Sequence, residues 1–110
     1  MTDTNVQARL AALGDPSRRA IFDLLADGPL PVGEIAKRLP VTRSAVSQHL
    51  RILGDVGIVV HKTLGTRNFY RLDPKAVAQI RDYLDDVWTK ALSTFRSRTE
   101  KRQKVKGDTQ

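Results

Sequence analysis

Apolar residues recur at helical spacing in five stretches of the chain, usually three and four positions apart. This spacing gives an α-helix one apolar face. Two stretches open on the same start signal, Asp15-Pro16 and Asp73-Pro74, where Asp can cap the helix and Pro suits its first position. The pattern therefore predicts five helices, the last much the longest. They cover residues 4–13, 16–27, 32–39, 43–56 and 74–98.

Between the fourth and fifth helices the pattern changes to β-branched and aromatic residues. Residues 58–63 and 67–72 favour two strands, and residues 64–66 can turn the chain between them. No Asn-Gly or Asp-Gly pair fixes the turn, so its type stays open. A short helix, a tight turn, a second helix and a hairpin form the order of a winged helix-turn-helix. We expect a mainly α fold with a β-hairpin wing: five helices and a small sheet of two to three strands.

The chain has 110 residues, the size of one domain. We expect residues 1–98 to form a single DNA-binding and dimerisation domain, and residues 99–110, which lack an apolar face, to form a disordered basic tail. Because 19 Lys and Arg stand against 12 Asp and Glu, the net charge is +7, which favours a polyanionic partner.

The sequence contains no cysteine, which excludes disulfides, thiolate metal sites and cysteine nucleophiles. The first residues do not form a signal peptide, and no run of 18 apolar residues occurs that would span a membrane. We therefore expect a cytoplasmic protein associated with the nucleoid. An enzyme is disfavoured, because neither a Ser-His-Asp arrangement nor a glycine loop for phosphates is recognisable, and we assign no catalytic residue.

The fourth helix carries polar and basic side chains on the side opposite its apolar stripe. The major groove of DNA is about 12 Å wide and admits one α-helix, whose polar side chains reach the base edges. Such a stripe is by itself most often a solvated helix face, but a short helix before it and a basic hairpin after it favour DNA binding. The residues expected to contact DNA are Thr42, Arg43, Ser44, Ser47, Gln48 and Arg51 on the helix and Lys62 and Arg67 on the hairpin.

These segments resemble the ArsR/SmtB repressors over about residues 8–95. The resemblance implies a dimeric repressor that binds an inverted repeat and releases DNA when an effector changes the dimer. Several linked motifs make it specific. They are DPSRRAI at 15–21, VGEIAKRL at 32–39, VTRSAVSQHLRIL at 41–53, which matches the recognition helix, and GTRNFYRLDP at 65–74, which matches the wing.

The chain departs from the metal-sensing members of that family. Its last helix has Asp82, Asp85 and Asp86 but no histidine, and carboxylates alone are poor ligands for borderline and soft metals. His49 and His61 lie on different predicted elements without a third ligand. We therefore expect a member without a metal site or cofactor, and a small-molecule effector stays open and unidentified.

The last helix has more apolar surface than one small domain is expected to bury. A second copy of the chain is the simplest partner for it, although the stripe could also cover only its own core. Trp88 is the expected anchor, since large aromatic residues dominate such contacts. The predicted dimer interface consists of Leu10, Leu13, Ile80, Leu84, Val87, Trp88, Leu92 and Phe95.

Other nucleic-acid functions compete with this hypothesis. The main alternative is a basic protein that binds nucleic acid without sequence preference, such as an RNA-binding, ribosome-binding or chromosome-associated protein. A protein–protein adaptor is less favoured, because the polar helix face is neither acidic nor apolar. The sequence leaves the operator, the target genes and the choice between repressor and activator open, as well as any contact of the basic tail with DNA.

Overall fold

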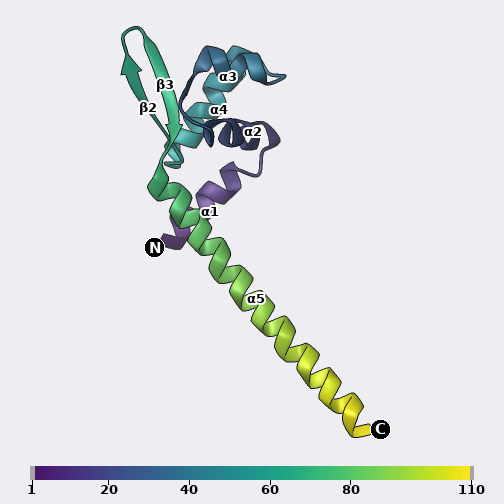
Figure 1. Cartoon of the computed structure of the whole chain (residues 1–110). Helices are drawn as coiled ribbons and strands as arrows, with labels where there is room; N and C mark the ends of the chain where they lie inside the picture. Colours follow the sequence, from purple (N-terminus) through teal and green to yellow (C-terminus); the bar gives the residue numbers. More distant parts are fainter. Residues whose placement is uncertain (1, 110) are drawn as a thin grey trace. The chain divides into compact units, whose positions relative to one another are not determined.

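Five helices and a three-stranded sheet make up the described part of the chain, as the sequence pattern predicted (Figure 1). The computed structural model describes the backbone of residues 2–109 and the side chains of residues 5–99. The elements follow in the order α1 (Thr2–Ala12), α2 (Pro16–Leu25), β1 (Leu30–Pro31), α3 (Val32–Arg38), α4 (Arg43–Asp55), β2 (Val59–Leu64), β3 (Arg67–Leu72) and α5 (Pro74–Thr109).

The helix starts follow the capping residues of the sequence. The Asp15 carboxylate accepts a hydrogen bond of 3.0 Å from the backbone N–H of Arg18 at the start of α2. The Thr42 hydroxyl accepts one of 3.1 Å from the backbone N–H of Ala45 and so caps α4. Each bond satisfies an N–H group that has no partner within its own helix. The polar residue at each start therefore fixes where the helix begins.

The wing is the antiparallel hairpin of β2 and β3, in which Val59 pairs with Leu72 and Leu64 pairs with Arg67. The pairing leaves a two-residue turn. Gly65 has a φ of 65°, whereas Thr66 keeps a negative φ, the combination of a type II′ turn. This settles the turn type that the sequence left open.

The position of the third strand, β1, was not predicted, although a sheet of two to three strands was expected. It is only two residues long and includes a proline, so it carries no strand pattern of its own. It pairs antiparallel with β3, Leu30 with Tyr70 and Pro31 with Phe69, which gives the strand order β1-β3-β2. β1 thereby ties the segment just before α3 to the wing.

The core lies under α2, α3 and α4. Its apolar side chains come from the helical stripes of the sequence and from the residues that lead into β2. α4 turns Val46, Leu50 and Leu53 inward, which leaves its polar face outward. The largest fully buried side chains are Ile21, Ile35, Val46, Leu53 and Ile58.

α5 begins at Pro74 and buries Ala76 and Ile80 in the core, while residues 81–110 form a separate compact unit. The helix extends to Thr109, past Arg98, where the sequence pattern placed its end. Side chains from residue 100 onward lie outside the described ones, so the basic tail of residues 99–110 stays a prediction. Among the described helices, none combines the length and apolar character that a membrane crossing requires.

Candidate nucleic-acid interface

The polar face of α4 is open to solvent along its whole length. Every side chain that the sequence pattern assigned to DNA contact on this helix is exposed, whereas the opposite face is buried. The Thr42 hydroxyl also caps the helix. The structure thus brings together on one surface Thr42, Arg43, Ser44, Ser47, Gln48 and Arg51.

The wing adds exposed cations beside this helix. Lys62 on β2 and Arg67 on β3 are both exposed. The guanidinium carbon of Arg67 lies 5.4 Å from the centroid of the Phe69 ring, a cation–π distance that orients the side chain without neutralising it. Near the turn, the Thr63 hydroxyl donates a hydrogen bond of 2.6 Å to the Asn68 side-chain oxygen and so links the two strands.

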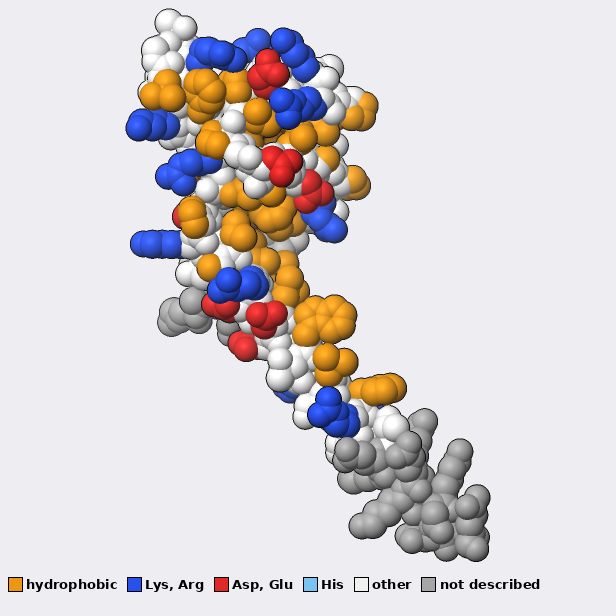
Figure 2. Space-filling model, viewed as in Figure 1, with side chains coloured by type: hydrophobic (Ala, Val, Ile, Leu, Met, Phe, Trp, Pro, Cys, Tyr) orange, Lys and Arg blue, Asp and Glu red, His pale blue; other side chains and the backbone are white. Residues whose placement is uncertain are grey.

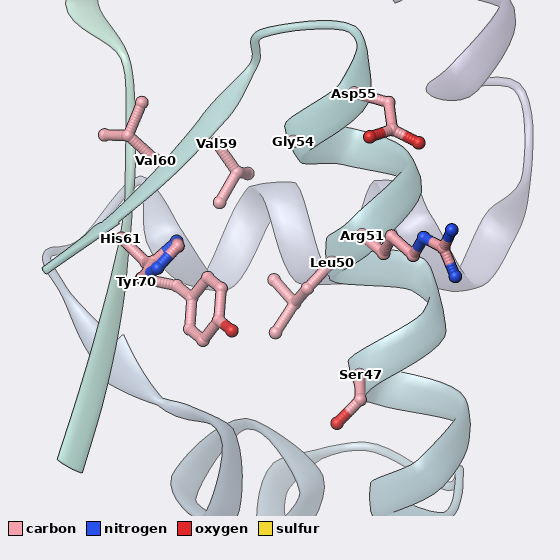
Figure 3. Close-up of a pocket in the computed structure, with 9 residues that line it drawn as sticks. All are labelled: Ser47, Leu50, Arg51, Gly54, Asp55, Val59, Val60, His61 and Tyr70. Atoms are coloured by element: carbon pink, nitrogen blue, oxygen red, sulfur yellow. The ribbon is translucent and has the colours of Figure 1, made fainter. Parts of the chain in front are cut away.

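A groove of about 570 Å³ separates α4 from the wing (Figure 3). Leu50 and Tyr70 point toward one another across it, and Arg51 points away from the strands. The His61 ring lies 5.4 Å from the Tyr70 ring, centroid to centroid. The groove is lined from both sides, by α4 and by the two strands of the wing. Its lining consists of Ser47, Leu50, Arg51, Gly54, Asp55, Val59, Val60, His61 and Tyr70.

The two histidines and the aspartates of the last helix were the candidate metal ligands that the sequence offered. Within the described residues, no group of three or more His, Cys, Asp or Glu side chains has an arrangement that could hold a metal ion. His49 is partly buried on α4, and its Nδ1 atom is buried without a hydrogen-bond partner among the described residues. Asp82 accepts a hydrogen bond of 3.1 Å from Arg81, while Asp85 and Asp86 are exposed.

The cap of α2 carries a perturbed carboxyl group. The backbone N–H of Arg18 holds the pKa of Asp15 below its ordinary value of 3.8. Partial desolvation opposes this shift, and electrostatic interactions with Arg18 and with His49 on α4 lower the pKa of Asp15 further. The ionised form of Asp15 is therefore the one that the folded chain favours.

The predicted dimer residues fall into two groups. Leu13 and Ile80 are only 8 % and 7 % exposed, because they pack into the protomer's own core, and Leu10 packs against it. In contrast, Trp88 is 63 % and Phe95 is 72 % exposed. Figure 2 shows hydrophobic side chains along the described part of α5. The exposed group on α5 comprises Leu84, Val87, Trp88, Leu92 and Phe95.

Comparisons with known proteins agree with this geometry. Residues 13–62 match the model of a family described as "Helix-turn-helix domain". The HTH-type transcriptional regulator Rv2034 of Mycobacterium tuberculosis is 51% identical over 84 residues, which cover 76% of this chain and 78% of the relative. A crystal structure described as a possible transcriptional regulator for arsenical resistance is 40% identical, with a TM-score of 0.67 and coverage of 73% of this chain and 83% of that one.

The chain is also similar to a solution structure of a homodimeric domain. It is the homodimeric winged helix-turn-helix DNA-binding domain of Mb0332 from Mycobacterium bovis, a possible ArsR-family regulator. It is 30% identical, with a TM-score of 0.65, and covers 83% of this chain and 84% of that one. The chain belongs to the ArsR/SmtB family.

This ArsR/SmtB protein is a DNA-binding transcriptional regulator, and its relatives are regulators rather than enzymes. The family and the winged helix-turn-helix fold that the sequence predicted are confirmed. The role of each predicted site residue is not tested by the comparisons and stays a prediction.

Sequence reasoning missed three residues of this ArsR/SmtB protein. Asn68 bonds Thr63 across the wing, Gly33 lies beside Arg43, and Arg9 on α1 bonds the end of α4. Asn68 had a local signal, because it stands beside Arg67 next to the turn. Gly33 is a glycine within a predicted helix, which is also a local signal. Arg9 had none, since its partner Val56 is far away in the sequence.

Proposed function

We propose that this regulator binds a specific double-stranded DNA site as a homodimer and acts as a repressor at an inverted repeat. The observation that carries the proposal is the exposure of the polar face of α4 next to a basic wing. A helix that buries one face in its own core and offers the other to solvent is suited to enter the major groove.

Residues of α4 and the wing have different tasks in this proposal. Gln48 and Arg51 contact base edges, since Gln pairs well with adenine and Arg with guanine. Ser44 and Ser47 are small and let the helix approach the groove floor. Lys62 on the wing contacts phosphates, which holds the register without adding sequence information.

The dimer in this proposal forms through the exposed apolar face of α5. A monomer would leave Trp88 and Phe95 largely in water, and a self-complementary patch is the simplest way to cover them. The homodimeric state of the Mb0332 domain supports this assignment. Leu13 and Ile80 are buried within the protomer, so we narrow the proposed contact surface to the exposed α5 residues.

The choice of repression follows the names of several relatives. The transcriptional repressor SdpR of Bacillus subtilis and the arsenical resistance operon repressor of Staphylococcus xylosus are 34% and 30% identical, whereas HlyU of Vibrio cholerae, at 33%, is named an activator.

Because the chain has no cysteine, we propose that it does not sense metals through thiolates. Residues 1–98 carry DNA binding and dimerisation, and residues 99–110 form a basic tail. The protein acts on chromosomal DNA in the cytoplasm.

Selection from a pool of random duplexes tests the proposal. The wild-type protein is expected to enrich an inverted repeat, with half-sites separated by about one helical turn, roughly 10–10.5 base pairs, or a multiple of it. Enrichment of a single half-site would contradict the dimer. Tight binding without any enrichment would favour the alternative, a basic protein that binds nucleic acid without sequence preference.

A further inference from the structure

A second, smaller cleft lies between the tip of the wing and the starts of α3 and α4. It has a volume of about 280 Å³. Arg43 enters from the first position of α4, and Arg67 enters from the start of β3. No carboxylate is among its lining residues, which are Pro31, Val32, Gly33, Arg43, Thr66, Arg67 and Asn68. The cleft is therefore a strongly basic and largely polar hollow.

The charges of the two arginines are not neutralised by the protein. The ion pairs among residues 5–99 join Lys37 to Glu34 and Arg81 to Asp82, and neither Arg43 nor Arg67 has a carboxylate partner there. Arg67 packs against the Phe69 ring at 5.4 Å, which holds the guanidinium in place but leaves its N–H groups available. Two like charges at one cleft repel each other, and an anion between them relieves that repulsion.

Gly33 lines the cleft next to Arg43. A Cβ atom at this position would lie 3.8 Å from Nη1 of Arg43, in ordinary van der Waals contact. A longer side chain would extend into the space in front of the guanidinium. A Cβ atom alone therefore fits at this position, and only a longer side chain would fill the cleft.

We propose that this cleft binds one oxyanion, a phosphate group of the DNA backbone, held by the guanidinium groups of Arg43 and Arg67. Guanidinium groups present paired N–H donors that match the oxygens of a phosphate. The Asn68 amide and the Thr66 hydroxyl supply further polar groups to the lining. This inference rests on the proposed function, because DNA bound by α4 is what brings a phosphate to the cleft.

The proposal gives Arg43 a different task from the one that the helix pattern predicted. On the polar face of α4 it was grouped with the residues that contact bases. As a phosphate ligand, it contributes equally to all sequences and shares one phosphate with the wing. The start of the recognition helix and the tip of the wing then bind the same phosphate, which fixes the angle at which α4 enters the major groove.

A double-mutant cycle tests the shared phosphate. Arg43→Gln and Arg67→Gln are each expected to lower affinity about tenfold, equally for the selected and a scrambled duplex, and to reduce the salt slope by about one. The double variant should lose clearly less than the product of the two single losses, because both ligands serve one phosphate. Arg71→Gln removes the same charge from β3 outside the cleft and is the matched control, with less than twofold loss expected.

Two outcomes of this double-mutant cycle overturn the inference. Losses that simply multiply would show two independent contacts, and a loss by Arg43→Gln on the selected duplex alone would show base contact. A wild-type protein that binds both duplexes equally would instead refute the proposed function, while the same cycle on either duplex would still test the cleft. The two failures are therefore distinguishable.

A second variant changes the cleft without changing charge. Gly33→Leu places a good helix former in α3 and adds a long side chain next to Arg43. It should lower affinity for both duplexes by a factor similar to that of Arg43→Gln, while its circular dichroism and melting curve stay close to those of the wild type. Unchanged affinity in this folded variant would contradict the proposal.

A titration with inorganic phosphate tests whether the cleft binds free phosphate or only a phosphate of the DNA backbone. Phosphate is titrated into the wild type and the double variant without DNA, and the amide NMR signals of Gly33 and Asn68 are followed. Saturable shifts in the wild type alone would show that the cleft also takes free phosphate. If the losses of DNA affinity in the double-mutant cycle are coupled but no such shifts occur, the phosphate must belong to the DNA backbone. Absence of both effects overturns the inference.

Discussion

The Nε atom of Arg9 donates a hydrogen bond of 2.8 Å to the backbone carbonyl oxygen of Val56. Val56 is the C-terminal cap of α4, so the bond satisfies one of the carbonyl groups left free at the end of that helix. Arg9 also donates through Nη1 to the Gln79 side chain on α5. One side chain of α1 thus connects the end of the proposed recognition helix to the beginning of α5.

Arg9→Met keeps the aliphatic stem and removes both hydrogen bonds. We expect the free energy of unfolding to fall by about 1–3 kcal/mol, because the part-buried carbonyl of Val56 loses its partner. Urea denaturation measures this change. Arg19→Met, an equivalent substitution at an exposed site on α2, is the control and should change stability by less than about 0.5 kcal/mol. Equal effects of the two substitutions would show that the Arg9 bonds contribute nothing measurable.

The lowered pKa of Asp15 predicts that the free energy of unfolding depends on pH in the acidic range. A carboxyl group whose pKa is lower in the folded than in the unfolded chain stabilises the fold at pH values above its pKa in the unfolded chain, near 3.8. This stabilisation is lost as the pH falls through the lower pKa of the folded chain. Asp15→Asn retains a capping side chain but cannot ionise. The wild type should therefore be the more stable at pH 6, and the difference should disappear toward pH 2. A difference that is the same at both pH values would contradict the titration of Asp15 as its source.

Trp88 is expected to anchor the dimer. Trp88→Ala should weaken dimerisation by about 2 kcal/mol or more, the range typical of an interface hot spot. Sedimentation velocity over a series of protein concentrations measures the effect. Leu64→Ala changes another exposed apolar residue, on the wing, and should leave the dimer intact. A dimer unaffected by Trp88→Ala would remove this residue from the interface.

Base contact and phosphate contact are separated by a pair of substitutions. Gln48→Ala should cost about 1–3 kcal/mol on the selected duplex and little on a scrambled one, because it removes a base contact. Lys62→Ala should weaken both duplexes alike. Fluorescence anisotropy at fixed salt compares the four affinities. Uniform losses for both variants would show that α4 does not supply the sequence preference through Gln48.

The local elements of this fold are predictable because each helix start carries its own signal. Asp15 and Thr42 cap the helices at the positions their sequence indicates. β1 carried no such signal, since its strand character comes only from pairing with Tyr70 and Phe69 of the distant wing. The turn type needed the observed φ of Gly65, because no turn dipeptide specified it.

The polar face of α4 was also predictable, since helical spacing alone places its residues together. The burial of Leu13 and Ile80 was not, because an apolar stripe does not distinguish residues that pack on their own core from those that face a partner. That Arg43 and Arg67 line the same cleft depends on where the wing lies relative to the starts of α3 and α4. The periodicity of the sequence does not predict that arrangement.

The most direct test of the central claim is a titration of the wild-type protein against a selected inverted repeat and a scrambled duplex at several salt concentrations. We predict that two protomers bind each inverted repeat and that the preference for the repeat persists as salt rises, while the affinity for both duplexes falls. Equal affinities with the same steep salt slope would show attraction to phosphates alone. That result would contradict sequence-specific regulation by this protein.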